Sequence, residues 1–414
     1  MTEASEFKND FVRQPVPEAD RRPWWKIFSV WVGFIVVVGI MAVGGGMAAG
    51  MSLKPFLGAV LIGNTILGLL AALSGYVGAK SGKSFPQLCG DVFPGRSSVL
   101  VLLYAPITLV AWYAIECSIF GALIAHVLGL GPMAGRVAMA LSAAVFCITT
   151  YLGIKGMQWL SVVLVPVIVA LGGYAFFYVL ATGSGHFGFG PAPVSFNDGV
   201  GLVIGSWALG VVAAYPDLAR FARSPAVGAL MGFFGILVFN SLNLLIGAAG
   251  AALSSQYDPA LILLAAGTPL LAIIMAVGNI WTTNDANLYS ASLGVARAFP
   301  LSRRPVVLAC AAIAVIVAFF NPAQFTVLFS FLAVLGNTAP ALGGVVLGGY
   351  FLTRDGERPA SPWAAWIGWG AGSLAGYVSH GVLSVPLGFA VAFVVWAMLN
   401  ALLQRARRVS DATA

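Results

Sequence analysis

Long apolar runs, separated by short polar segments, cover most of the 414-residue chain. Runs of 18 or more mainly apolar residues recur between Trp31 and Leu403, and each is long enough to cross about 30 Å of hydrocarbon as a helix. The alternation of apolar and polar positions that is typical of membrane β-barrels is not visible. The pattern therefore predicts an all-α membrane protein with about twelve spans. Their expected ranges are 27–50, 56–79, 98–129, 132–153, 157–181, 198–217, 226–253, 266–296, 304–320, 324–352, 362–379 and 383–403.

Composition supports this interpretation, because the chain is 60% hydrophobic and only 8% charged. In a soluble domain roughly a quarter of the residues are charged. This chain has too few charged residues to cover a water-facing surface of its size. The first span is too long, and the tail before it too acidic and extended, for a cleaved signal peptide.

The basic residues predict the orientation of the spans. With a cytoplasmic N-terminus, all but Lys54 and Arg136 of the 21 lysines and arginines fall on the inner side, as the positive-inside rule requires. We therefore expect a multi-pass protein of the bacterial inner membrane with both termini in the cytoplasm. The net charge of +7 then reflects topology rather than affinity for nucleic acid.

The polar ends bound a single membrane domain. Residues 1–26 are expected to form a cytoplasmic tail that is disordered or lies on the membrane surface, and 405–414 form a second, basic cytoplasmic tail. The region 27–404 between them contains no linker long enough to separate two domains.

Glycines make two spans easy to interrupt. Gly44, Gly45 and Gly46 lie in the first span, and Gly205 and Gly210 in the sixth. Interrupted spans at corresponding positions of two halves are typical of inverted repeats with a binding site at mid-membrane. The alternative is that these glycines only allow close helix packing.

Two carboxylates, Glu116 and Asp285, lie within predicted spans, where ionisable groups are costly and usually functional. Trp112 stands four residues before Glu116 and so shares its helix face. An indole beside a carboxylate suits a flat, partly polar ligand, although a lone tryptophan is more often a packing residue. Asp217 and Arg220, near the inner end of the sixth span, are expected to form a structural ion pair.

The eighth span contains a polar run from Gly278 to Asn287 in which six of ten residues are small and polar or acidic. Asn279, Thr282 and Thr283 share one helix face, and their oxygens are hard ligands suited to a small cation such as sodium. Hydrogen bonding between helices would explain one or two such residues, but not six. Neither the four cysteines nor the three histidines show metal-ligand spacing.

Several segments carry a resemblance to a known family, the nucleobase–cation symporter family 1, over nearly the whole membrane region. The most specific is the run from Asn279 to Asp285, and the branch of the family that carries cytosine is the most similar. The other segments are Gly50–Ser52, Leu61–Asn64, Gly75–Lys80, Gly205–Trp207, Arg220–Phe221 and Gly247–Ala252. The resemblance implies a leucine-transporter-like fold of two inverted five-helix repeats (27–181 and 198–352) followed by two extra helices (362–403).

The resemblance also implies the site. A heterocycle would stack between Trp112 and Trp207, with Ser206 and Asn284 as polar contacts. A sodium ion would bind backbone carbonyls of an unwound first span and side chains of the eighth. The matching residues are Gly33 and Val36, and Asn279, Thr282 and Thr283.

The expected function is import of a nucleobase, cytosine first, by symport with Na⁺ or H⁺ through alternating access. A hydroxymethylpyrimidine-type thiamine precursor or a purine is the alternative cargo. Glu116 departs from the family pattern: it either reads an amidine-like N–H pair on the substrate or exchanges a proton, and Asp285 is a second candidate for coupling.

No cofactor besides the coupling ion, no nucleic acid and no obligate protein partner is expected. A channel would need a continuous polar pore, whereas the polar residues here cluster at one depth. The sequence contains no Gly-x-Ser-x-Gly or His-Glu-x-x-His motif, so we do not expect an enzyme.

Overall fold

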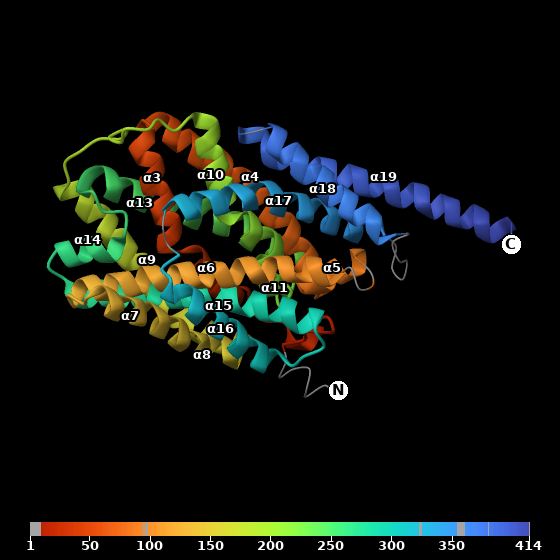
Figure 1. Ribbon diagram of the computed structural model, residues 1–414, viewed down its shortest axis with the longest axis horizontal. Coiled ribbons are helices and arrows are strands. Elements are labelled where there is room, and N and C mark those ends of the chain that lie inside the picture. The colour runs from red at the N-terminus through yellow and green to blue at the C-terminus, as the bar shows by residue number, and fades with distance from the viewer. Residues whose placement is uncertain are drawn as a thin grey trace.

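The computed structural model describes residues 10–93, 95, 98–322, 325–353, 361–379 and 381–413, and helices account for nearly all of their regular structure. Most helices run along the long axis of the molecule, and the first and last described segments of the chain lie toward the same end of it, away from α13 and α14 (Figure 1). Lys8, Arg96, Arg354 and Arg358, which entered the charge count above, lie outside the described residues.

The first half of the chain forms five of the expected spans, and the first of them is broken. The short 3₁₀ helix η1 (Glu18–Asp20) precedes it. The helices are α2 (Trp24–Ile35) and α3 (Val38–Gly50), α4 (Leu53–Ser81), the connecting helix α5 (Phe85–Val92), α6 (Ser98–Val127), α7 (Pro132–Val145) with α8 (Cys147–Leu152), and α9 (Ile154–Thr182).

The second half begins with two spans that each contain a π-helical segment. These are α10 (Phe196–Leu209), η2 (Gly210–Ala214) and α11 (Tyr215–Ala219), then α12 (Pro225–Phe234), η3 (Gly235–Asn240) and α13 (Ser241–Ser254). The remaining helices are α14 (Pro259–Ala265), α15 (Pro269–Ala298), α16 (Arg303–Phe319), α17 (Phe325–Leu352), α18 (Pro362–Ser379), the 3₁₀ turn η4 (Gly381–Leu383) and α19 (Ser384–Thr413). These helices fit the predicted division into repeats, whose boundaries stay a prediction.

Eight helices of the described residues are long and apolar enough to cross a membrane, or up to ten if each of two bent pairs is one span. This is fewer than the twelve that the sequence predicts. The polar run from Gly278 to Asn287 lowers the hydropathy of α15, and α16 has only 17 residues. Both helices nevertheless coincide with predicted spans.

The first span breaks at Val36 and Val37, not at its glycines. Both valines are extended, and α3 continues at an angle of 49° to α2. A side chain at Gly44 would collide with the backbone of Leu244, so this glycine serves the close packing of α3 against α13. The glycine run therefore has the packing role that was its alternative interpretation, and the break lies several residues earlier.

Two asparagines satisfy the backbone groups that the break releases. The amide of Asn279 donates to the carbonyl of Val36 (3.0 Å) and accepts from the N–H of Val38 (2.9 Å). Asn243 donates to the carbonyl of Ile35 (2.5 Å). Unsatisfied backbone groups cost several kcal/mol in hydrocarbon, which explains why polar side chains meet here.

The N-terminal segment from Asp10 is docked, contrary to the expectation of a disordered or surface-lying tail. Asp10 forms an ion pair with buried Arg303 (3.2 Å), and its carbonyl accepts a hydrogen bond from Arg220 (2.7 Å). The side-chain amide of Gln87 donates to three carbonyls of this segment, and Val16 donates to the carbonyl of Gly82 (2.8 Å). We call residues 10–16 the N-terminal strap.

Asp217 and Arg220 do not form the expected ion pair. Asp217 accepts from the backbone N–H of Phe85 (2.7 Å), where α5 begins. Arg220 instead binds the strap and the hydroxyl of Tyr289 (3.0 Å). Both side chains are buried, and Arg220 still contacts Asp217 through the backbone, because its Nε donates to the Asp217 carbonyl (3.1 Å).

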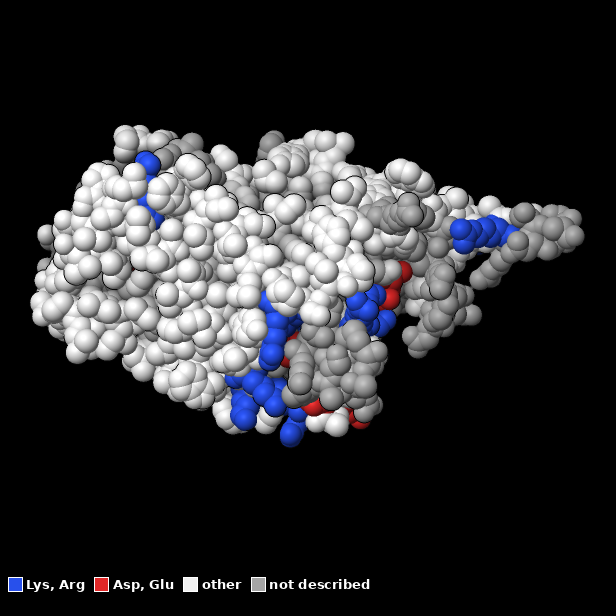
Figure 2. Space-filling view, turned by 60° about the horizontal axis from the view of Figure 1, so that its bottom comes forward, with Lys and Arg blue, Asp and Glu red and all other residues white. Residues whose placement is uncertain are grey.

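Charged side chains gather toward the end of the molecule that carries the first and last described segments. On the face that Figure 2 shows, most of the blue surface lies there together with the visible acidic surface, and a small basic spot stands apart at the other end. The broad surface between them is almost free of charge, as a bilayer-facing surface must be.

Candidate functional site

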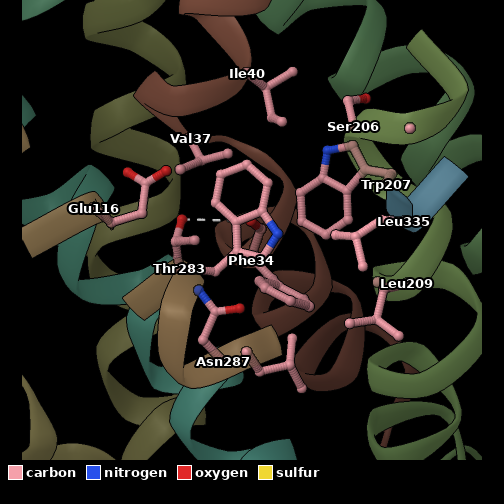
Figure 3. Close-up of a pocket in the computed structure, with 14 residues that line it drawn as sticks. Phe34, Val37, Ile40, Glu116, Ser206, Trp207, Leu209, Thr283, Asn287 and Leu335 are labelled. Carbon is pink, nitrogen blue, oxygen red and sulfur yellow. Dashed lines mark hydrogen bonds between the residues drawn. The ribbon is translucent and has the colours of Figure 1, made fainter. Parts of the chain in front are cut away.

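A pocket lies at the break in the first span, near mid-membrane. Its walls come from five spans: the two sides of the break, α6, α10 with η2, α15 and α17. Residues from the two repeats thus meet there, as expected for a site between repeats. Figure 3 shows Glu116 on one side of the pocket and Trp207 with Ser206 on the other, with Asn287 below.

Two indoles line the pocket, as the sequence predicts. The Trp207 indole makes edge-to-face contacts with Trp31 (ring centroids 5.8 Å apart) and with Phe34 (ring centroids 4.8 Å apart, planes at 86°). Trp112 packs against Phe331 (5.7 Å). The π-helical turn after Trp207 leaves Gly210 so close to the indole that a side chain there would collide with it.

Glu116 lines the same pocket and is fully buried. The backbone N–H of Gly39 interacts with its carboxylate, which has no other hydrogen-bond partner among the described residues. The indole N–H of Trp207 has no partner among these residues either. The carboxylate lies against Gly39, in the first turn of α3, where a side chain would collide with Oε1. The positive end of the α3 dipole therefore faces this carboxylate. The pocket thus offers a carboxylate with remaining acceptor capacity on one side and an indole donor without a partner among the described residues on the other.

Ser206 lines the pocket, but its hydroxyl donates to the carbonyl of Val203 (2.5 Å). Asn284, the amide that the resemblance placed beside the substrate, does not line the pocket. Its side chain faces α6, with Cys117 Sγ at 3.3 Å. Asn287 lines the pocket instead, because it follows Thr283 by four residues and so shares its face. The same spacing argument would have found Asn287 in the sequence.

The predicted cation ligands meet beside the pocket. The hydroxyl oxygen of Thr283 lies 3.3 Å from the carbonyl oxygen of Gly33, and 3.4 Å from those of Phe34 and Val36. Hydroxyl and carbonyl oxygens without a formal charge suit a weakly bound monovalent cation. No group of three or more His, Cys, Asp or Glu among the described residues is placed to hold a metal.

The other predicted ligands of α15 have local partners. The hydroxyl of Thr282 donates to the carbonyl of Gly278 (2.8 Å) and lies 3.3 Å from that of Asn279. The Asn279 amide bridges the break in the first span and so stabilises the site indirectly. Ser161 of α9, which the sequence did not single out, lies next to Gly33, and its buried hydroxyl has no hydrogen-bond partner within the described part of the chain.

Asp285 faces away from the pocket. Its carboxylate accepts hydrogen bonds from Thr149 and Thr150 at the end of α8, and the indole of Trp281 donates to Thr149 (2.8 Å). Its second oxygen is buried and has no partner among the described residues. In this arrangement Asp285 joins α15 to α8.

Asp258 lies outside the membrane-spanning segments, where it caps α14. It accepts from the backbone N–H of Ala260 (2.8 Å), and burial raises its pKa from 3.8 to about 6. It also lines a small cavity beside Val38 and Asn279, next to the break in the first span.

Comparison with known proteins agrees with this architecture. Residues 15–363 match the family model described as permease for cytosine/purines, uracil, thiamine, allantoin. The cytosine permease of Escherichia coli (strain K12) is 30% identical over 412 residues, which cover 96% of each protein.

Among solved structures, Mhp1, a nucleobase-cation-symport-1 family transporter, superposes with a TM-score of 0.81 in a closed conformation with bromovinylhydantoin bound. The two chains are 18% identical, and 95% of each is covered. A Na⁺-coupled sialic acid symporter in a substrate-bound outward-open state superposes with a TM-score of 0.64, at 13% identity, over 96% of this chain and 95% of that one.

These similarities confirm the expected transporter fold and a membrane transport protein rather than an enzyme. The family model covers most of the chain, including the broken first span and the polar run of α15. The chain therefore belongs to the family of permeases for cytosine, purines, uracil, thiamine and allantoin.

Proposed function

We propose that this permease imports a nucleobase, most favourably cytosine, together with one sodium ion. The observation that carries the proposal is the position of Thr283. Its side chain lines the pocket, and its hydroxyl also lies at the three carbonyls of the broken first span. One side chain therefore contacts both candidate sites.

The cation would bind first. It would replace the long contacts between Thr283 and the carbonyls of Gly33 and Val36, with Thr282 as a further ligand. A bound ion would hold α2 and α15 together at the break, which fixes the wall of the pocket that Phe34 and Val37 form. Ion and base then each bind better when the other is present, and this coupling is reciprocal.

The base would stack on Trp112 and Trp207, where each contact with an indole contributes on the order of 1–3 kcal/mol. The carboxylate oxygens of Glu116 would accept two N–H groups from the edge of the ring, as an amidine-like edge offers them. Asn287 supplies an amide on the same wall as Thr283. Cytosine offers such an edge when its ring nitrogen N3 carries a proton, and the related cytosine permease supports it as the first cargo.

Glu116 also supports a wider cargo class. A guanine-type purine presents such a pair of N–H groups in its neutral form, an aminopyrimidine precursor presents it when its ring is protonated, and uracil does not. We therefore rank aminated bases above oxo bases. Transport would proceed by alternating movement of one helix group against the other around the fixed site, with both termini of the chain in the cytoplasm of a bacterial cell.

The decisive experiment is a competition panel of unlabelled bases against radiolabelled cytosine in proteoliposomes, with and without a sodium gradient. We expect competition by aminated bases, little by uracil, and accumulation only with inward sodium. Uptake that requires a proton gradient and does not depend on sodium would contradict the assignment of sodium as the coupling ion. Glu116 and Asp285, whose carboxylates have unpartnered buried oxygens, would then be the groups to substitute. Preference for uracil would contradict the role of Glu116.

A further inference from the structure

A second, apolar groove lies between α9 and the seventh span, which pack against each other. It encloses about 230 Å³ and is separate from the pocket described above. One wall is the α9 segment from Ile168 to Phe177, and the other runs from Phe239 to Ile246. Asn243 is the polar side chain of this lining, and its amide is directed to the carbonyl of Ile35.

The rim of the groove belongs to the membrane-facing surface. Phe177 is 69% exposed on one wall and Leu242 is 41% exposed on the other. Both lie in helices that are long and apolar enough to span the bilayer. The groove is therefore continuous with the surface that contacts lipid, and hydrocarbon chains are its immediate surroundings.

The dimensions fit one lipid tail. The α9 wall from Ile168 to Phe177 is about 14 Å long at a rise of 1.5 Å per residue. This is half of a hydrocarbon core of roughly 30 Å, the depth that the tails of one leaflet occupy. Because Ile168 lies near the middle of α9 and Phe177 near its Thr182 end, the groove runs from the bilayer centre toward one interface.

The groove is hollow because glycines form part of its floor. A side chain at Gly173 would meet no atom within 4 Å, and one at Gly172 would make ordinary contact with Ile246. An unfilled apolar hollow forfeits the dispersion contacts of its lining. A flexible chain drawn from the surrounding bilayer supplies those contacts without any protein partner.

We propose that an acyl chain of a membrane phospholipid occupies this groove and that its end lies against Val36 at the break of the first span. Val36 lines both the groove and the candidate cation site through different atoms, its side chain and its carbonyl. The site is thus a lipid-tail site on the wall of the broken helix. It is independent of which solute the permease carries.

The test is photochemical labelling of the full-length protein in nanodiscs. The discs contain phosphatidylethanolamine and phosphatidylglycerol with a small share of a phosphatidylglycerol whose tail carries a diazirine. Labelled residues are mapped by peptide mass spectrometry. We expect the groove residues Val169, Phe176 and Leu245 to be labelled several-fold more than Ile313, an exposed residue of α16. Equal labelling of groove and Ile313 would overturn the proposal.

Filling the groove provides the matched comparison. Gly173→Leu should lower the labelling of the groove at least tenfold and leave Ile313 unchanged. Gly370→Leu in α18 is the control, since a side chain at Gly370 also meets no atom within 4 Å. Leu242→Trp narrows the groove from the opposite wall. It is the variant to label if Gly173→Leu fails to fold. Unchanged labelling in a folded groove variant would contradict the lipid assignment.

Discussion

At the scale of single residues, spacing along a helix predicted which side chains meet, and local contacts decided what they do. Trp112 and Glu116 share a face and line one pocket, as the four-residue spacing implies. Asn284 and Asn287 show the limit of motif matching, because the helix turns about 100° per residue and only Asn287 shares the face of Thr283. The surroundings of the Glu116 carboxylate could not be predicted from spacing, since they depend on Gly39 of another helix.

Thr283→Val removes one hydroxyl and keeps the shape of the side chain. We expect the sodium concentration for half-maximal uptake to rise roughly tenfold or more, equivalent to about 1.4 kcal/mol. Sodium titration of uptake in proteoliposomes measures this. Thr65→Val is the control, because its hydroxyl donates to Leu61 on an exposed face of α4. An unchanged sodium dependence in Thr283→Val would remove Thr283 from the cation site.

Glu116→Gln replaces one acceptor oxygen by a donor. We expect the affinity for aminated bases to fall roughly ten- to a hundredfold, since a hydrogen bond to a charged group contributes about 1.5–3 kcal/mol. Gly39→Ala should act in the same direction, because the new methyl group displaces the carboxylate. Binding is measured by scintillation proximity with radiolabelled cytosine. If affinity and ranking of the bases stay the same in Glu116→Gln, the carboxylate does not contact the substrate.

Asp258 predicts a pH dependence of stability. Its folded pKa of about 6 lies above the ordinary value of 3.8, so the folded state holds its proton more tightly than the unfolded state. The contribution of protonated Asp258 to the free energy of unfolding is fully present below about pH 4 and is lost as the pH rises through 6. The two-unit difference corresponds to about 3 kcal/mol. In Asp258→Asn, the unfolding temperature should depend less on pH between pH 4 and 7. If its pH dependence is the same as in the unaltered protein, the raised pKa of Asp258 is contradicted.

At the scale of helices, the spans were predictable from local pattern. The glycine run alone put the break in the wrong place, whereas the resemblance put it near Gly33 and Val36. Apolar runs located each helix, because length and hydropathy are local properties. The first span breaks at two valines because Asn243 and Asn279, about 200 residues further along the chain, supply partners for its backbone. The docking of the N-terminal strap could not be predicted from local sequence either, since it depends on contacts with Gln87, Arg220 and Arg303 of distant elements.

Asp10→Asn tests the strap. The side chain of Arg303 is only 1% exposed, and loss of the carboxylate leaves its charge without the ion pair. Breaking a buried pair by removing one partner costs about 3–5 kcal/mol. We expect a lower unfolding temperature in detergent. Asp91→Asn is the matched control, because Asp91 pairs with Lys83 on the exposed surface. Equal unfolding temperatures of the two variants would mean that the strap contributes little.

At the scale of the whole molecule, charge distribution and architecture agree. The first and last described segments and most of the visible basic surface lie toward one end (Figures 1 and 2), and all but two of the chain's basic residues were assigned to one side from the sequence. Such agreement was predictable because orientation depends on loop charges, which need no tertiary contacts.

Reporter fusions test the orientation. Green fluorescent protein at the C-terminus should fluoresce and alkaline phosphatase there should be inactive. Alkaline phosphatase fused after Gly188, between α9 and α10, should be active. The reverse pattern would mean that the molecule is inserted upside down.

The shared hydroxyl of Thr283 has an energetic consequence for the cell. If one side chain must satisfy ion and base together, the two travel in a one-to-one ratio, and each uncharged base brings one positive charge inward. The membrane voltage then adds to the sodium gradient, at about 2.3 kcal/mol per 100 mV. Scavenging of dilute bases would consequently weaken when the membrane is depolarised, because the sodium concentration gradient alone would then drive uptake.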